Sequence, residues 1–200
     1  MNRAILTLAI FLLVPAGAFI AGCGAESPDP DTVLERSLAP ERLATAFPEA
    51  GVTVQSLGYE DRVLEERRLA VPDHVLREIR AALADSNEGF RDLADGLEYV
   101  GTAEIGAEET DHISGELDTV ALADALDGSS AASPDAIGLP GSDLDQTLVG
   151  AGFDLYSGTA DDVLRRLDLT LSLDDPDNAL PPTRIRFSLT GESQLPSDPA

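Results

Sequence analysis

The chain has no lysine, no tryptophan and one cysteine, and each shortage argues against a class of structure or partner. Its 13 basic residues are all arginines and stand against 37 acidic residues, a formal net charge of −24. Such a surface repels phosphate, which argues against nucleic acid as a partner and against a basic patch for anionic lipid. One cysteine excludes an intrachain disulfide. Because aromatic residues make up only 4% of the chain, Leu, Val, Ile and Ala must build its interior.

The longest apolar run stands at the N-terminus and has the layout of a secretory signal. Arg3 supplies a positive charge, residues 4–14 are apolar, and small residues precede Cys23. The segment Ile20-Ala21-Gly22-Cys23 resembles the lipobox of bacterial lipoproteins. This resemblance implies cleavage before Cys23 and diacylation of its thiol. Two acyl chains make a stable anchor, so we expect the chain to be lipid-anchored on the extracytoplasmic face of the cell membrane.

The alternative for this run is an uncleaved membrane anchor, because residues 4–22 are almost long enough to span a bilayer. Against it, no basic stop-transfer cluster follows, and the run is interrupted by Pro15, Gly17 and Gly22. We therefore divide the chain into a signal peptide (1–22), a lipidated cysteine with a flexible tether (23–31), a single α+β domain (32–190) and a disordered tail (191–200).

Helical periodicity is confined to short segments. Residues 32–46 have a helical pattern that Pro40 interrupts, and Pro72 suits the first turn of a second helix. One apolar stripe of that helix comprises Val75, Leu76, Ile79, Ala82 and Leu83. A further short helix is predicted with Phe90, Leu93, Ala94 and Leu97 on one side, and Asp118 is expected to cap a helix over residues 120–126. Leu144, Leu148 and Val149 indicate a helical turn or two.

A period of two predicts strands over most of the remaining chain. Short strands are expected at 52–54 and 62–71, and a hairpin is expected over 97–105 and 112–118 with its turn at Gly106-Ala107. Residues 127–142 are rich in Gly and Pro and are predicted to form a loop. The strongest alternation lies in a strand that begins at Phe153 and turns at Ser157-Gly158-Thr159, and in 163–173 and 184–189, which together predict an antiparallel meander. The fold class is therefore α+β: an antiparallel sheet, apolar on one face, covered by short helices.

Two segments resemble a known family. They are Glu109–Asp118 (ETDHISGELD) and Phe153–Gly158 (FDLYSG) with Asp161–Leu173 (DDVLRRLDLTLSL). They are similar to the LppX/LprG-type actinobacterial lipoproteins, which have a LolA/LolB-like fold, and the resemblance extends over residues 69–190. It implies a curved antiparallel half-barrel whose concave face is covered by helices, and a membrane-anchored carrier of lipids or lipidated proteins. Few residues before Pro72 have a strand pattern, so the half-barrel would be N-terminally shortened.

The resemblance implies an apolar cavity for an acyl lipid or glycolipid, with the helices of 72–97 or the 127–142 loop as a movable lid. The expected cavity residues are Val75, Leu76, Ile79, Leu83, Leu97, Tyr99, Ile113, Leu117, Phe153, Leu155, Leu167, Leu169, Leu171, Ile185, Phe187 and Leu189. The same pattern is equally compatible with a closed core in a tethered structural or protein-interaction module. Each buried CH2 of a ligand would contribute about 0.8 kcal/mol, so tight binding needs no polar motif.

No residue set indicates catalysis, a metal or a cofactor, so the chain is not expected to be an enzyme. Its two histidines, His74 and His112, lack metal spacing, and Ser114 beside His112 does not form a nucleophile elbow. The acidic run over 174–178 could bind calcium weakly but suits an ordinary turn. Arg165, Arg166, Arg184 and Arg186 could contact a lipid phosphate, although pairing with Asp161, Asp162 and Asp168 is the favoured use.

Overall fold

The computed structural model describes residues 27–47, 50–84, 89–127, 148–174 and 183–191. Their elements, in chain order, are α1 (Pro30–Ser37), α2 (Pro40–Leu43), β1 (Ala50–Leu57), the 3-10 helix η1 (Tyr59–Asp61), β2 (Val63–Ala70), α3 (Asp73–Ala84), α4 (Phe90–Leu93), β3 (Ala94–Ile105), β4 (Glu108–Leu117), α5 (Thr119–Asp127), β5 (Leu148–Gly158), β6 (Leu164–Leu173) and β7 (Thr183–Gly191). The predicted signal, Cys23, residues 128–147, most of the acidic turn and the tail from 192 lie outside the described residues.

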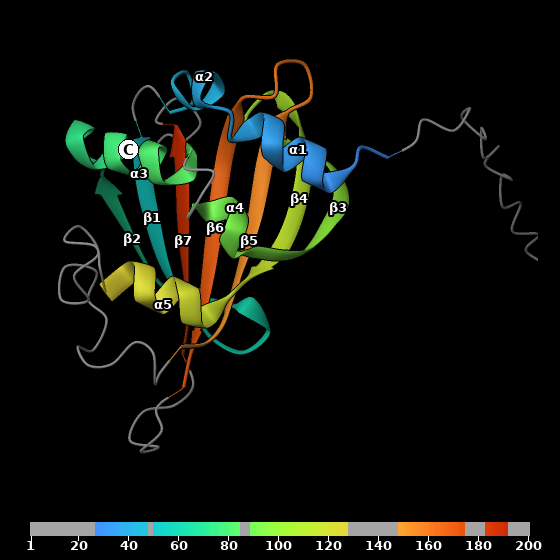
Figure 1. Ribbon diagram of the computed structural model, residues 1–200. Helices are drawn as coiled ribbons and strands as arrows, with labels where there is room; N and C mark the ends of the chain where they lie inside the picture. The colour runs from blue at the N-terminus through green and yellow to red at the C-terminus, as the bar shows by residue number, and fades with distance from the viewer. Residues whose placement is uncertain (1–26, 48–49, 85–88, 128–147, 175–182, 192–200) are drawn as a thin grey trace, which may run out of the picture.

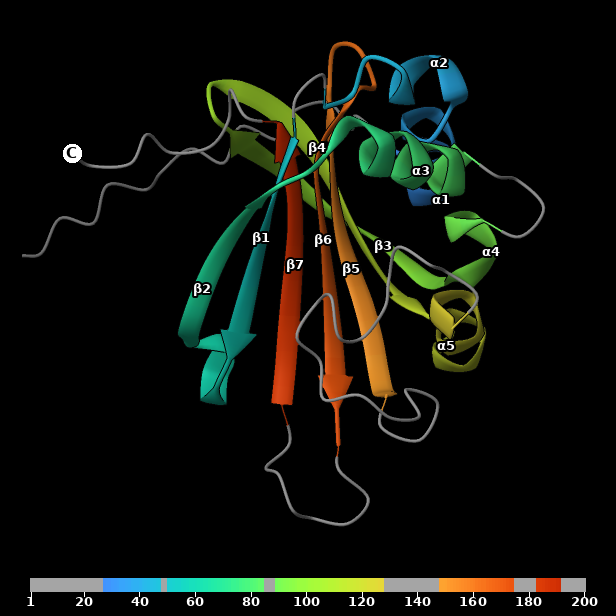
Figure 2. The ribbon, with the colours of Figure 1, turned by 90° about the vertical axis from the view of Figure 1, so that its left-hand side faces the viewer.

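The strands form one antiparallel sheet in the order β2-β1-β7-β6-β5-β4-β3 (Figure 1). The α+β class, the 97–118 hairpin and the β5-β6-β7 meander are confirmed. The sheet is open and uncurled, and β2 and β3 are its edges. Figure 2 shows the helices on one side of it, so one face is covered by helices while the described helices leave the other uncovered.

Local chemistry explains where the helices begin. Asp29 caps α1 by accepting hydrogen bonds from the Thr32 N–H (3.0 Å) and hydroxyl (2.7 Å). Pro40 starts a separate helix because its ring cannot continue α1, as the sequence predicted. Asp118 caps α5 through the N–H groups of Val120 and Ala121, which confirms its predicted role.

Two helical predictions are wrong. The helix expected to continue through Ala94 and Leu97 ends at Leu93, because β3 begins there and Ala94 pairs with Leu117 of β4. Leu148 and Val149 belong to β5 rather than to a helical turn, and Leu148 pairs with Leu173. In both places pairing with a neighbouring strand overrides a pattern that fits either period. The strand expected at 52–54 is longer than predicted, since β1 also pairs with β7 over its whole length.

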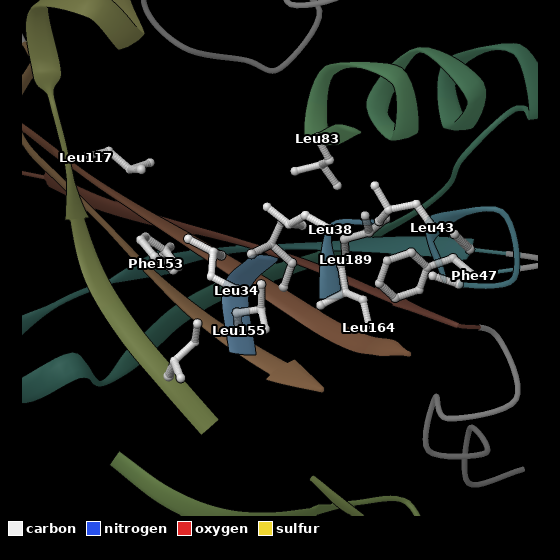
Figure 3. Packing of buried hydrophobic residues seen from close by; sticks show 14 of the residues in the cluster. Leu34, Leu38, Leu43, Phe47, Leu83, Leu117, Phe153, Leu155, Leu164 and Leu189 are labelled. Carbon is white, nitrogen blue, oxygen red and sulfur yellow. The ribbon is translucent and has the colours of Figure 1, made fainter. Parts of the chain in front are cut away.

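The core lies between the sheet and the helices. Its most completely buried apolar side chains are Leu34 of α1, Leu43 of α2, and Ile113, Leu155 and Leu164 of the sheet (Figure 3). Within the described ranges, no helix combines the length and apolarity that crossing a bilayer requires.

The contact of β4 with β5 generates a stability prediction. A Cβ atom on Gly115 would lie 2.7 Å from the Phe153 ring and 3.0 Å from the Asp95 carbonyl oxygen. At Gly150, a Cβ atom would meet Ser172 at an ordinary 3.6 Å. Gly115→Ala should lower the free energy of unfolding by about 1–3 kcal/mol through overpacking, and Gly150→Ala should leave it nearly unchanged. Urea denaturation of both variants measures the difference, and equal midpoints would contradict the packing assigned to Gly115.

Candidate functional site

The strand register gathers apolar side chains into rows across the helix-facing side of the sheet. One row joins Ile113, Leu155, Leu167, Leu189 and Val52, which are cross-strand neighbours from β4 to β1. The next row joins Phe153, Leu169, Phe187 and Val54, and the third joins Ala151, Leu171 and Ile185. The alternation in β5, β6 and β7 therefore produces a continuous apolar surface, as expected for strands with one buried face.

Burial decreases toward β7 and β1 along the first two rows. Ile113 and Leu155 are 0% exposed and Phe153 is 2% exposed. In the same rows Phe187 and Val54 remain half-buried, as does Ile185 in the third row. The first two rows are thus closed over β4 and β5, and their cover is incomplete at Phe187 of β7 and at Val52 and Val54 of β1, although Leu189 of β7 is buried.

The helices account for this gradient. Helix α1 packs on β3, β4 and β5, and α5 packs on β5, whereas the main contacts of α3 are with α2 and α4. Figure 1 shows α3 across the ends of β2, β1 and β7 at which β1 begins and β7 ends. Leu76 and Leu83 of α3 join the core, while Val75 and Ile79 are half-buried. Helix α3 is therefore supported by other helices more than by the strands it faces.

Arg80 holds α3 against α2. Its Nη2 atom donates hydrogen bonds to the carbonyl oxygen of Ala46 at 2.7 Å and to that of Phe47. These carbonyls follow α2, where Phe47 has a positive φ of 53°. The buried Nε atom of Arg80 has no hydrogen-bond partner among the described residues. The position of α3 thus depends on a side chain that reaches more than thirty residues back along the chain.

Of the sixteen residues predicted to line a cavity, the structure brings fourteen into one apolar cluster. Nine are buried: Leu76, Leu83, Ile113, Leu117, Phe153, Leu155, Leu167, Leu171 and Leu189. Five are half-buried and pack against them: Ile79, Leu97, Tyr99, Leu169 and Phe187. Val75 and Ile185 are half-buried outside that cluster. Whether a ligand occupies this surface stays a prediction.

Some residues of this surface were not predicted. Val52 and Val54 of β1 extend the rows, and Phe90 of α4 meets the Phe153 ring edge-on, with ring centroids 4.8 Å apart. The apolar–polar–apolar order of Val52, Thr53 and Val54 is the sequence feature that could have placed both valines on the apolar face of β1. The sequence predicted that Phe90 lies on a helix, but nothing in the neighbouring sequence indicates that its ring contacts β5.

A hollow of about 820 Å³ lies elsewhere, where β3 begins and β4 ends. It contains one of the predicted residues, Leu117, and its walls carry Asp92, Asp95, Glu116 and Asp118. Four carboxylates make it unsuited to an acyl chain. Among the residues the structure describes, no group of His, Cys, Asp or Glu side chains has the arrangement of a metal site.

The opposite face of the sheet carries paired charges. Arg166 binds Asp168 through Nε–Oδ1 (2.7 Å) and Nη2–Oδ2 (2.6 Å), and the Asp168 side chain is only 5% exposed. The Arg166 guanidinium also lies 5.6 Å from the centre of the Tyr156 ring. Burial raises the pKa of Tyr156, and Asp154 and Asp168 raise it further. His112 stacks on Tyr156 and contacts Asp154 at 2.8 Å through Nε2, a partner that the sequence did not reveal.

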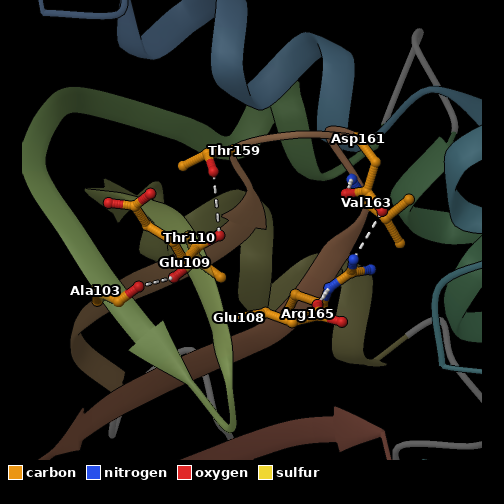
Figure 4. Close-up of polar contacts among 8 residues, drawn as sticks. All are labelled: Ala103, Glu108, Glu109, Thr110, Thr159, Asp161, Val163 and Arg165. Carbon is orange, nitrogen blue, oxygen red and sulfur yellow. Dashed lines mark hydrogen bonds and ion pairs between the residues drawn. The ribbon is translucent and has the colours of Figure 1, made fainter.

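The prediction that arginines pair with acids is confirmed for Arg166 and for Arg165. Arg165 binds Asp161 at 2.7 Å and also Glu108, and Figure 4 shows how this joins the β5–β6 turn to the β3–β4 turn. Burial would raise the pKa of Asp161, but hydrogen bonds from the Val163 N–H and Arg165 outweigh it and lower that pKa. Arg184 pairs with Asp61 instead of a predicted acid, and Arg186 reaches Thr170 at 3.5 Å.

On the helix-facing side, the Tyr99 hydroxyl donates a hydrogen bond to Asp111 at 2.9 Å. Burial, together with this carboxylate, raises the pKa of Tyr99 to about 12. Tyr99 therefore stays protonated at neutral pH and places a polar group at the margin of the apolar rows. His74 is exposed on α3, away from its apolar side chains, as the sequence indicated.

Comparison with known proteins gives a fold likeness. No family model and no curated protein matches the chain. Among solved structures it is similar to LprF from Mycobacterium bovis, with 12% identity over 88% of this chain and 99% of that one, and a TM-score of 0.41. It is also similar to the lipoprotein LppX from Mycobacterium tuberculosis, with 12% identity over 86% and 99% of the two chains, and the same TM-score. The resemblance inferred from the sequence named the same type of lipoprotein.

The Arg80 contacts generate a prediction about α3. Arg80→Met keeps the apolar stem but removes both hydrogen bonds to the carbonyls after α2, so amide hydrogen exchange in α3 should accelerate by about tenfold. Arg77→Met is the matched control, because Arg77 is exposed on the same helix and contacts only the Asp73 carbonyl, at 3.4 Å. Equal exchange rates in the two variants would mean that Arg80 does not hold α3.

Proposed function

We propose that this chain is a lipid-anchored envelope protein that binds a lipid or another long apolar ligand between α3 and the β7–β1 part of the sheet. The observation that carries the proposal is the half-buried apolar surface formed by Phe187, Ile185 and Val54 on the helix-facing side of β7 and β1, strands on which none of the described helices has its main packing contacts. Covering these partly exposed apolar side chains with an acyl chain is favourable, by about 25 cal/mol for each Å² of apolar surface that is removed from water.

The chemistry of the site favours binding without catalysis. The three rows offer apolar surface, and the nearest polar group described above, the Tyr99 hydroxyl, is already bound to Asp111. Of the arginines that could have held a lipid phosphate, Arg166 and Arg184 lie on the other face and are engaged by Asp168 and Asp61. Arg165 is engaged by Asp161 and Glu108. Selection of a ligand would therefore rest on its length and shape, as in other apolar sites.

Anchoring through Cys23 completes the proposal. The lipobox-like Ile20–Cys23 segment supports two acyl chains on the first residue of the mature protein. Attachment raises the concentration of the domain beside the membrane in which an apolar ligand resides. The strongly acidic chain supplies no basic surface for binding to anionic lipid headgroups, so attachment would rest on the acyl chains.

The second candidate is a tethered interaction module with a closed core. It is favoured by the complete burial of Ile113, Leu155 and Leu34, which shows that much of the apolar surface needs no ligand. The two candidates differ only in whether the β7–β1 surface takes up an apolar molecule.

Native mass spectrometry separates the candidates. The Cys23→Ser chain, which cannot carry covalent lipid, is incubated with vesicles of dioleoyl phosphatidylcholine. We expect a bound lipid mass that solvent extraction removes. Val54→Glu places a charge on the helix-facing surface and should reduce the bound fraction about tenfold. Thr53→Glu adds the same charge to the adjacent position on the opposite face and should have little effect. A bare protein mass under all conditions would favour the closed core.

Anchoring is tested separately by cell fractionation. Cys23→Ser should move the processed chain from the membrane fraction to the soluble fraction, because the thiol that carries the acyl chains is gone. The unsubstituted chain should remain with the membrane in high salt. If the intact mass of the unsubstituted chain still includes residues 1–22, the N-terminal run is an uncleaved anchor.

A further inference from the structure

Strand β2 is an edge strand that the described part of the chain leaves uncovered. It pairs with β1 on one side, and all eight of its residues are exposed. Among them, Leu64 is 66% exposed and Leu69 is 48% exposed. Such an edge offers unpaired N–H and C=O groups together with apolar side chains, which is a surface for another strand.

The other edge, β3, has the features that usually prevent strand pairing. Its register with β4 shifts twice, and Gly96 and Gly101 have positive φ. Its charged side chains are all acidic: Asp95, Glu98 and Glu104. In β2 the register shift lies at the start of the strand, and residues 65–70 pair one-to-one with β1. Irregularity and like charge therefore protect β3, but not β2.

The charges of β2 are balanced and ordered. Its sequence, VLEERRLA, holds two glutamates followed by two arginines between apolar ends. Within the strand Arg67 binds Glu65 at 2.8 Å and Arg68 binds Glu66 at 3.4 Å. On a chain with a net charge of −24, this neutral strip is where a second copy meets less electrostatic repulsion.

Backbone direction fixes which residues can bond outward. The N–H of Val71 donates to the Ala50 carbonyl at 3.2 Å, so Val71 points toward the chain of β1. Because backbone direction alternates along a strand, Arg67 and Leu69 also point toward β1. Glu66, Arg68 and Ala70 then direct their N–H and C=O groups toward the open side.

We propose that β2 pairs antiparallel with β2 of a second copy, about a two-fold axis that passes Arg67. Symmetry requires that outward-pointing residues face one another. Centring on Arg67 places Glu66 opposite Arg68 twice and Ala70 opposite Leu64 twice. The two Arg67 side chains meet at the axis, where each is offset by the Glu65 that it already binds.

Centring one residue earlier is less favourable. Glu66 would face Glu66 of the second copy, and Ala70 would face Arg62. The N–H and C=O groups of Arg62 are already bonded to Tyr59 and Gly58. Both registers make two opposite-charge pairs, Glu66 with Arg68 or Glu65 with Arg67, so charge alone does not choose between them. The register centred on Arg67 is selected because all of its outward-pointing backbone groups are free to bond. A pair of short edge strands buries little surface, so the dimer would be weak and would form when copies are concentrated.

Cysteine crosslinking of the full chain in cell membranes tests the register. In Arg67→Cys the two Cα atoms would lie about 4.5 Å apart across the axis, within the range of a disulfide. In Glu65→Cys, equally exposed on the same strand, the two Cα atoms would lie more than about 13 Å apart. We expect oxidation to crosslink the first variant and not the second. The unsubstituted chain measures any crosslink through Cys23.

Charge exchange tests the partner. Adding Glu66→Arg to Arg67→Cys places arginine opposite arginine at two positions and should lower the crosslinked fraction by about tenfold. Adding Arg68→Glu as well restores opposite charges and should restore the crosslink. Absence of a crosslink in Arg67→Cys, equal crosslinking of Glu65→Cys, or no response to charge exchange would each overturn the proposal. All these positions are exposed, and circular dichroism checks that the variants fold.

Discussion

The alternation of apolar and polar side chains along β5, β6 and β7 is the constraint on which the rest of the structure depends. It places Leu155, Leu167 and Leu189 in one row on one face, and that face must be removed from water. Helices α1 and α5 accomplish this over β3, β4 and β5. Over β7 and β1 the cover is α3, which is held mainly by other helices. The partly covered surface follows from this division of the helices.

The opposite face follows a different rule, because polar side chains in a sheet can satisfy one another. Arg166 and Asp168 lie two residues apart on β6 and form a bidentate pair, and Tyr156 and His112 stack beside it. A buried carboxylate such as Asp168 is tolerated because its partner is fully engaged. Arg165, Arg166 and Arg184 thus form ion pairs with a turn of the sheet, within β6 and with η1, respectively.

Sequence reasoning predicted most strands because each has a clear period of two, and it located helix ends where Pro40, Pro72 and Asp118 give a chemical reason. It failed at Ala94 and Leu148, which fit a helical or a strand period equally well and whose state is decided by pairing with distant residues. The pairing of β1 with β7 joins residues more than 120 positions apart and has no local signal.

The candidate site likewise has one part that the sequence predicts and one part that only the folded chain determines. Alternation predicted which side chains share a face, so fourteen of the sixteen residues lie in one cluster. The distance between α3 and the sheet is not encoded by periodicity, because a helix with an apolar stripe can lie directly on strands or be supported by neighbouring helices. Arg80 decides between these arrangements through two carbonyl groups after α2, and only the folded chain brings them together.

The two proposed surfaces meet at β1 and β2 without competing. The register continues the helix-facing rows into β2, with Leu69 beside Val52 and Arg67 beside Val54. An apolar ligand beneath α3 would cover the face of β1, whereas a second copy would bond to the outer edge of β2. One contact uses side chains directed at the helices and the other uses backbone groups in the plane of the sheet. The two proposed contacts are therefore compatible with each other in geometry.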